Sequence, residues 1–190
     1  MSVVMMVGLA VAPQASADPF PRYEIIKPNV DFWVKIYSQY PTTQVVIHDS
    51  VDLSIVYDVI TVKPYDAPGA RKINRRRTKR AKAKYRDILK RLAANPQIDD
   101  KACQSVAKLF GTNADAKTYR RASQRVRSQL GQKDRFRAGL IRSGAYLDEI
   151  RTILKSNGVP EDLAYLPHVE SSFNPSAYSK FGAAGIWQFT

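Results

Sequence analysis

One carboxylic acid near the end of the chain, Glu170, occupies a position where acid–base chemistry is possible. Gly158 and Pro160 predict that one helix ends there and another begins. The second helix has an apolar face, formed at three- and four-residue spacing by Leu163, Tyr165, Leu166 and Val169. We expect these neighbours to exclude water from the carboxyl group and so favour the protonated form that a general acid requires. The alternative is an ordinary solvated glutamate at a helix end.

The twenty residues that begin at Glu170 read ESSFNPSAYSKFGAAGIWQF and place several residue types at fixed spacing. Glu170-Ser171, Asn174-Pro175, an Ala-x-Ser step, a Gly-Ala-x-Gly turn and an apolar pair before glutamine follow one another. This order resembles the first signature of the lysozyme-like soluble lytic transglycosylase domain, in the envelope branch that often carries LysM repeats. The resemblance covers about the last 33 residues.

The resemblance implies a lytic transglycosylase, a carbon–oxygen lyase acting on peptidoglycan strands. Such enzymes cleave the β-1,4 bond between N-acetylmuramic acid and N-acetylglucosamine without water and leave 1,6-anhydro ends. By position, Glu170 would be the single catalytic residue, first acid and then base, with no cofactor and no metal. Ser179 and Gln188 would bind the substrate, although Ser179 fits a turn-stabilising hydroxyl equally well. The motif gives supporting positions to Ser171, Asn174, Gly182 and Gly185.

Members of that family continue beyond the first signature through further helices, one of which carries a tyrosine near the acid. We therefore expect this chain to be the N-terminal part of a longer product, with a truncated catalytic domain and little activity alone. The second hypothesis is a non-catalytic peptidoglycan-binding or scaffold protein of the cell envelope.

The formal net charge of +13 predicts an anionic partner. Ten of the sixteen residues from Arg71 to Arg86 are Lys or Arg, and none is acidic. We interpret this run as the solvated face of a helix that holds the protein near an anionic cell-wall or membrane surface. A basic nucleic-acid binder is the third hypothesis. It is not favoured, because the run contains one aromatic residue, Tyr85, and no recognised nucleic-acid-binding motif accompanies it.

Residues 1–17 predict an export signal, which would place the protein in the periplasm or cell envelope. An apolar run too short to span a bilayer precedes Ala15-Ser16-Ala17, a cleavage pattern that ends before Asp18. The run lacks the usual positive residues before it, and the alternative is a loose apolar N-terminus.

Cysteine and histidine contents exclude two other kinds of site. The single cysteine, Cys103, cannot form an intrachain disulfide and is expected to pack as a small hydrophobe. His48 and His168 do not make a metal cluster. His168 precedes Glu170 by two residues and could tune it, but a core or helix-surface histidine is the preferred interpretation.

The predicted fold is mainly α, with one β-hairpin near the N-terminus formed by residues 44–50 and 53–62. Helices are expected over residues 30–41, 71–94, 98–110, 114–130, 136–142 and 146–155. In the helix expected over residues 114–130, the expected buried face is Tyr119, Ala122, Val126 and Leu130. In the helix expected over residues 71–94, it is Tyr85, Ile88, Leu89 and Leu92.

This pattern divides the chain after the signal into three regions. Residues 18–70 form a small α/β region with the hairpin and a Pro/Gly-rich linker, and residues 71–143 form a basic helical stem. Residues 144–190 begin the lysozyme-like helical catalytic domain that the resemblance implies.

Overall fold

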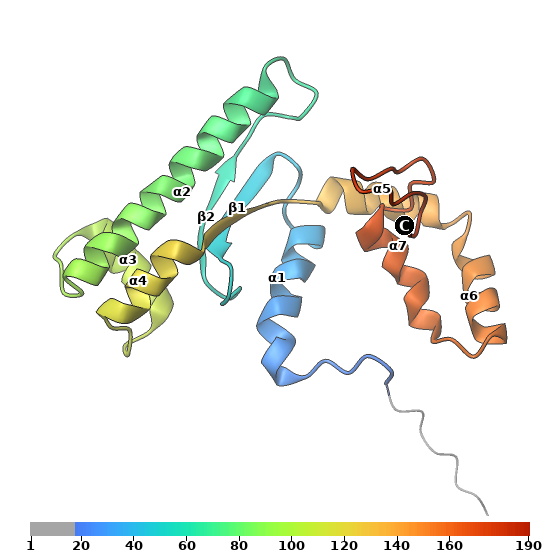
Figure 1. Cartoon of the computed structure of the whole chain (residues 1–190), viewed down its shortest axis with the longest axis horizontal. Helices are drawn as coiled ribbons and strands as arrows, with labels where there is room; N and C mark the ends of the chain where they lie inside the picture. Colours follow the sequence, from blue (N-terminus) through green and yellow to red (C-terminus); the bar gives the residue numbers. More distant parts are fainter. Residues whose placement is uncertain (1–17) are drawn as a thin grey trace, which may run out of the picture.

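A computed structural model describes residues 18–190, so the predicted export signal lies outside the described residues. The mainly α prediction is confirmed: this part of the chain contains seven α-helices and one three-stranded sheet. Figure 1 shows the sheet with α2, α3 and α4 on one side of the molecule and α5, α6 and α7 on the other. The helices are α1 (Lys27–Ser38), α2 (Ala70–Ala94), α3 (Lys101–Ala107), α4 (Ala116–Arg125), α5 (Lys133–Ser143), α6 (Leu147–Ser156) and α7 (Leu166–Glu170). Short 3₁₀ helices cover Glu24–Ile26, Lys108–Phe110 and Glu161–Tyr165. No helix within residues 18–190 is both long and apolar enough to cross a bilayer.

The predicted hairpin is confirmed as two antiparallel strands, β1 (Gln44–Asp49) and β2 (Val56–Thr61). Their pairing begins with Gln44 opposite Thr61 and shifts register between Ile47 and His48. β1 is the central strand, since the sheet order is β2-β1-β3. It is buried on both faces, which explains its nearly continuous apolar sequence.

The third strand, β3 (Val126–Leu130), corrects the prediction of one helix over residues 114–130. α4 ends at Arg125, and the chain then pairs antiparallel with β1, from Asp49 opposite Val126 to Val45 opposite Leu130. The apolar residues at 119, 122, 126 and 130 fit a helical period. Tertiary pairing with β1 overrides this local pattern, because it satisfies the backbone groups on the second edge of that strand.

A single hydrophobic core joins the sheet to α2, α3 and α4. The predicted buried face of α2 is confirmed, and Leu89 and Leu92 are almost completely enclosed. Cys103 packs here as a buried free thiol, as expected. The cations of Arg71–Arg86 lie mainly on the exposed side of α2. The predicted region over residues 18–70 and the predicted stem over residues 71–143 therefore contribute to one hydrophobic core. The division of the chain into three regions stays a prediction.

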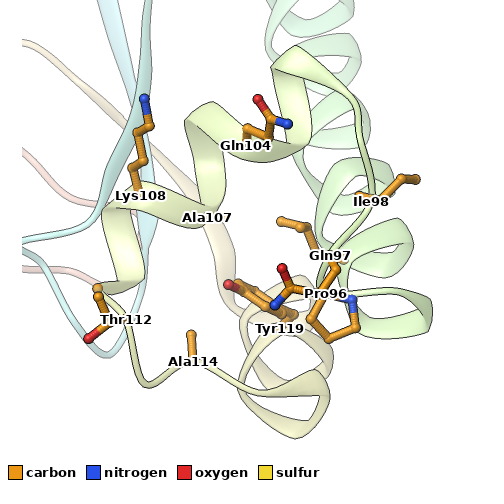
Figure 2. Close-up of a pocket in the computed structure, with 11 residues that line it drawn as sticks. Pro96, Gln97, Ile98, Gln104, Ala107, Lys108, Thr112, Ala114 and Tyr119 are labelled. Atoms are coloured by element: carbon orange, nitrogen blue, oxygen red, sulfur yellow. The ribbon is translucent and has the colours of Figure 1, made fainter.

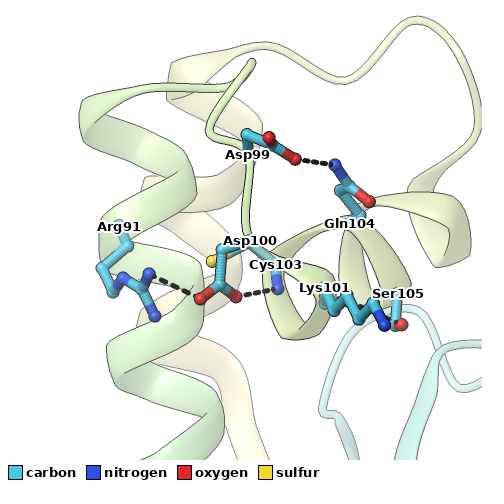
Figure 3. Close-up of polar contacts among 7 residues, drawn as sticks. All are labelled: Arg91, Asp99, Asp100, Lys101, Cys103, Gln104 and Ser105. Carbon is cyan, nitrogen blue, oxygen red and sulfur yellow. Dashed lines mark hydrogen bonds and ion pairs between the residues drawn. The ribbon is translucent and has the colours of Figure 1, made fainter.

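Asp100 fixes α3 to the end of α2 (Figure 3). Its carboxylate accepts a hydrogen bond from the backbone N–H of Cys103 at 2.9 Å and one from Arg91 at 3.0 Å. The first bond caps the N-terminus of α3, and the second adds an opposite charge. Together they lower the pKa of Asp100 to about 2.

α1 packs on the opposite face of the sheet from α2. Phe32 and Ile36 cover Val46, whereas the neighbouring side chains of β1 point into the core with α2. The predicted helix over residues 30–41 is thus confirmed, although it begins earlier, at Lys27.

The end of α1 is tied to the start of α5. The backbone N–H groups of Gln132 and Lys133 donate to the carbonyls of Ile36 and Tyr40, each at 2.9 Å. A Cβ added to Gly131 would lie 2.3 Å from the Tyr40 carbonyl oxygen, so only glycine allows this close approach. These contacts place α1 beside the helix that supports Glu170.

Candidate active site

The short helix that precedes Glu170 buries a different face from the one predicted. Leu166 and Val169 are 37% and 56% exposed, and Tyr165 is also exposed. Ala164, Pro167 and His168 are buried instead. A 3₁₀ segment over Glu161–Tyr165 precedes α7, and its three-residue period rotates the side chains away from the face that a continuous α-helix would bury.

His168 is a core residue, as preferred from the sequence. It is 3% exposed and lies among the rings of Phe136, Tyr165 and Phe173, with centroid separations of 5.3, 6.3 and 4.5 Å. Neither ring nitrogen has a hydrogen-bond partner among the described residues. Burial therefore lowers the pKa of His168 and favours the neutral imidazole.

The turn directly after Glu170 has an unusual backbone. Ser172 and Phe173 have φ values of 55° and 53°, a left-handed conformation that is costly for residues other than glycine. Phe173 is fully buried, and its N–H donates to the Pro167 carbonyl at 3.0 Å. Ser171 donates through Oγ to the Ile186 carbonyl at 2.8 Å, which holds the later signature residues against this turn.

Helix α5 supports the turn from the other side. Arg142 donates to the Ser172 carbonyl oxygen through Nε at 3.0 Å and through Nη2 at 2.6 Å. Gly139 lies so close that an added Cβ would be 3.0 Å from the same oxygen. α5 thereby fixes the residue two positions after Glu170.

Glu170 lines an open cavity of about 650 Å³ between α1, α5 and the turn. The side chain is exposed, so the partial burial expected from its apolar neighbours is not found. The other lining residues are mostly polar: Tyr37, Gln132, Arg135, Ala138, Arg142, Val169, Ser171, Ser172 and Asn174. Glu170 is the one carboxylate among the lining residues, which include two arginines.

Tyr37 brings a phenol from α1 into the same cavity. Its ring packs on Phe136 of α5, with centroids 5.4 Å apart. Burial, and to a smaller extent the negative charge of Glu170, raises the pKa of Tyr37. The phenol is therefore neutral and can donate a hydrogen bond inside the cavity.

Of the residues predicted for the site, Ser171 and Asn174 lie in the cavity with Glu170, whereas Ser179 and Gln188 do not line it. Ser179 Oγ accepts hydrogen bonds from the N–H groups of Phe181 and Ala183, at 3.2 and 2.9 Å. These are the contacts of a turn-stabilising hydroxyl, the alternative weighed from the sequence.

Gln188 also belongs to the loop over residues 177–189. It donates through Nε2 to the carbonyls of Ala177 and Gly185, at 3.2 and 2.8 Å. Gly182 and Gly185 have φ values of 90° and 74°, which explains glycine at both turn positions. The substrate-binding roles of Ser179 and Gln188 stay predictions.

A second cavity, of about 430 Å³, lies between the end of α2, α3 and the start of α4 (Figure 2). Tyr119, Gln104 and Lys108 are among the side chains that line it. It contains no residue predicted for the site and no carboxylate. Within residues 18–190, no group of three or more His, Cys, Asp or Glu side chains is arranged to hold a metal ion.

Sequence reasoning missed Tyr37, Gln132, Arg135 and Arg142 as site residues. Tyr37 lies in the helix expected over residues 30–41, and nothing in its local sequence shows that this helix docks on α5. One signal was available for Arg142: it lies on the helix that carries Gly139, and a glycine inside a helix can mark a place where another segment packs closely.

Comparisons with known proteins agree with the signature at the end of the chain. Residues 149–190 match the family model described as Transglycosylase SLT domain. A protein of Alteromonas sp. (strain M-1), named for tributyltin chloride resistance, is 45% identical over 49 residues, which are 26% of this chain and 24% of that protein. The match thus spans about a quarter of the curated relative. No solved structure matches the chain. The family match over residues 149–190 thus covers Glu170 and its supporting turn.

Proposed function

We propose that this protein is a peptidoglycan lytic transglycosylase that cleaves the β-1,4 bond between N-acetylmuramic acid and N-acetylglucosamine. The observation that carries the proposal is the position of Glu170: the glutamate of the SLT signature lies in an open, polar cavity with no second carboxylate. Most glycosidases require a pair of carboxyl groups, one on each side of the scissile bond. A site with one carboxylate suits a reaction in which the substrate supplies the nucleophile.

In the proposed reaction, Glu170 first donates its proton to the glycosidic oxygen as the bond from C1 of the muramoyl residue to that oxygen breaks. The resulting carboxylate then accepts the proton of the muramoyl 6-hydroxyl while its oxygen forms a bond to C1. Glu170 ends protonated, as it began, and no water is consumed. The substrate's acetamido group would stabilise the positive charge that develops at C1.

Several neighbouring residues are assigned supporting roles in this proposal. The neutral Tyr37 phenol would donate to the carboxylate or to the sugar, and Asn174 would contact the glycan from the turn. Ser179 and Gln188 would bind the N-acetyl groups from the loop that Ser171 holds beside the cavity. The two arginines of the cavity favour the anionic peptide-bearing strands of peptidoglycan.

We also propose that the protein is exported and works in the periplasm or cell envelope. Support comes from the cleavage pattern near residue 17 and from the peptidoglycan substrate class of the family. The cations of Arg71–Arg86 would then hold the protein near an anionic wall or membrane surface.

The test is digestion of purified sacculi by the protein produced from its complete coding sequence. Mass spectrometry of the released fragments is expected to show 1,6-anhydro ends, and Glu170→Gln is expected to abolish them while leaving sacculus binding intact. The matched control is Glu161→Gln, which removes another exposed carboxylate from the same segment. The Glu161 carboxylate pairs with Lys155 at 3.8 Å. This control should retain activity.

Other products would change the conclusion. Reducing ends in place of anhydro ends would identify a hydrolase. Binding to sacculi without any released product would favour the non-catalytic wall-binding protein.

A further inference from the structure

A groove of about 480 Å³ lies between α2 and the sheet and shares no lining residue with the Glu170 cavity. One wall is the basic helix α2, which runs along the outer edge of the molecule beside β2 (Figure 1). No acidic residue lines the groove. Six cationic side chains do: Lys63, Arg71, Arg75, Lys79, Lys82 and Arg86.

Five of these cations form one row along α2. Their positions, from Arg71 to Arg86, are separated by four, four, three and four residues, which places them on one helix face. The row extends for about 22 Å at 1.5 Å per residue. The ion pairs found within residues 18–190 involve none of the six groove cations. Their positive charge is therefore available to a ligand.

The groove is held in shape at both ends. Near its start, Asn74 exchanges two hydrogen bonds with the backbone of Lys63, at 2.9 and 2.8 Å. Near its end, Arg86 donates to the Val126 carbonyl at 3.3 Å. The first turns of α2 are thus fixed to the end of β2, and a later turn is fixed to the start of β3.

The floor of the groove is aliphatic. It is formed by Val45, Val62 and Leu130, which come from β1, from the residue after β2, and from β3. One aromatic residue, Tyr65, lines the groove, and it is 72% exposed. Nucleic-acid strands bind by stacking successive bases on several aromatic rings, and a single tyrosine does not provide such a series. An aliphatic floor under a cationic rim instead complements a phosphate group joined to hydrocarbon.

We propose that this groove is a docking site for anionic phospholipids of a membrane surface. The phosphate groups bind between the cations of α2 and Lys63, and the glycerol and upper acyl chain contact Val45, Val62 and Leu130. The inference narrows the proposed role of Arg71–Arg86 to one face of the helix and one ligand class. It does not depend on the lytic reaction, because vesicle binding is measured without a glycan substrate.

The test is flotation with vesicles of phosphatidylcholine, with and without phosphatidylglycerol. The protein is expected to bind the mixed vesicles and not the neutral ones. The triple variant Arg75→Glu, Lys79→Glu, Lys82→Glu is expected to weaken binding by about 100-fold or more, since each cation near an anionic surface contributes about fivefold. Circular dichroism checks that each variant retains its helices, and the corresponding glutamine substitutions provide a milder set.

The matched control is the triple variant Lys72→Glu, Arg76→Glu, Arg80→Glu. It makes the same change of net charge on the same helix, at exposed positions that do not line the groove. These side chains lie on average about 100° around the helix from the groove row, since successive residues of an α-helix are about 100° apart. They therefore point away from the proposed phosphate sites in the groove. We expect this variant to lose less than about fivefold. Equal losses in the two variants would overturn the proposal, because they would indicate attraction by net charge alone.

Soluble competitors separate the ligand classes. A short-chain phosphatidylglycerol should displace the protein from vesicles, whereas inorganic phosphate at the same concentration should not. Equal competition by phosphate would show that the aliphatic floor has no role. Tighter retention on single-stranded DNA than on vesicles would replace the lipid with a nucleic acid. A negative result in any of these vesicle experiments has no bearing on the assay for 1,6-anhydro products, which tests the proposed lytic reaction separately.

Discussion

The part of the molecule built on the sheet and the part built on α5–α7 differ in how they are held together. The first buries fifteen apolar residues in one core. In residues 133–190 the buried apolar side chains are those of Ala164, Pro167, Phe173 and Ala183, and many large apolar side chains are exposed. The non-glycine residues with positive φ within residues 18–190 all belong to this second part. One part thus supplies stability, while the other holds a strained turn beside Glu170 with few buried contacts.

The largest effect expected from this comparison comes from the same truncation made in each part. Leu89→Ala removes a side chain with no exposure in the main core and should lower the free energy of unfolding by about 3 kcal/mol. Leu166→Ala, four positions before Glu170, acts on a side chain that is 37% exposed and should cost less than about 1 kcal/mol. Urea denaturation measures both. Similar losses would show that the two parts are not held differently.

The next effect concerns the support that α5 gives to the turn, and its activity readout depends on the proposed reaction. In Gly139→Ala, the new Cβ would lie 3.0 Å from the Ser172 carbonyl oxygen, so the turn must move by a few tenths of an ångström. Because small displacements of catalytic groups are costly, we expect kcat/KM on sacculi to fall about tenfold. Gly144→Ala is the control, since its Cβ would make an ordinary 3.5 Å contact at the end of the same helix. Equal activity in the two variants would contradict the support by α5.

Much of the sheet-containing part could be predicted because its signals are local. The hairpin follows from β-branched runs around a turn, and the core face of α2 follows from the spacing of Tyr85, Ile88, Leu89 and Leu92. β3 could not be predicted, because its residues fit a helical period and only pairing with β1 selects the strand.

The candidate site divides in the same way. The signature located Glu170 and its turn, which lie in one short segment. It could not locate Tyr37, which reaches the cavity only because backbone bonds join α1 to α5. The apolar spacing before Glu170 also predicted the wrong buried face for α7, because the 3₁₀ segment before this helix changes the angle between successive side chains.

A smaller effect tests whether the sheet-containing part contributes to chemistry in the other part. Tyr37→Phe removes the one phenol hydroxyl that lines the Glu170 cavity and keeps the ring that packs on Phe136. Loss of one neutral hydrogen bond is worth about 1 kcal/mol, so we expect kcat/KM on sacculi to fall about fivefold with unchanged stability. Tyr40→Phe, in the same segment but outside the cavity, should have no effect on activity. A Tyr37→Phe enzyme as active as the control would confine the chemistry to α5–α7.

The smallest effect is a pH dependence that originates at His168. Burial lowers the pKa of this residue in the folded state, so the unfolded chain binds a proton more readily. The contribution is fully present above the unfolded pKa of about 6.5 and is lost as the pH falls below it. One such site changes the free energy of unfolding by at most about 1.4 kcal/mol per pH unit.

His48 complicates this measurement, because burial also lowers its pKa, although the Asp49 carbonyl opposes the shift. The comparison therefore requires His168→Phe, which keeps an aromatic ring among Phe136, Tyr165 and Phe173 and removes the titrating group. Urea denaturation at pH 7 and pH 5.5 should show a smaller loss of stability in this variant than in the unmodified protein. Identical losses would assign the acid sensitivity to the sheet-containing part, and the helical part would then tolerate protonation of its buried histidine.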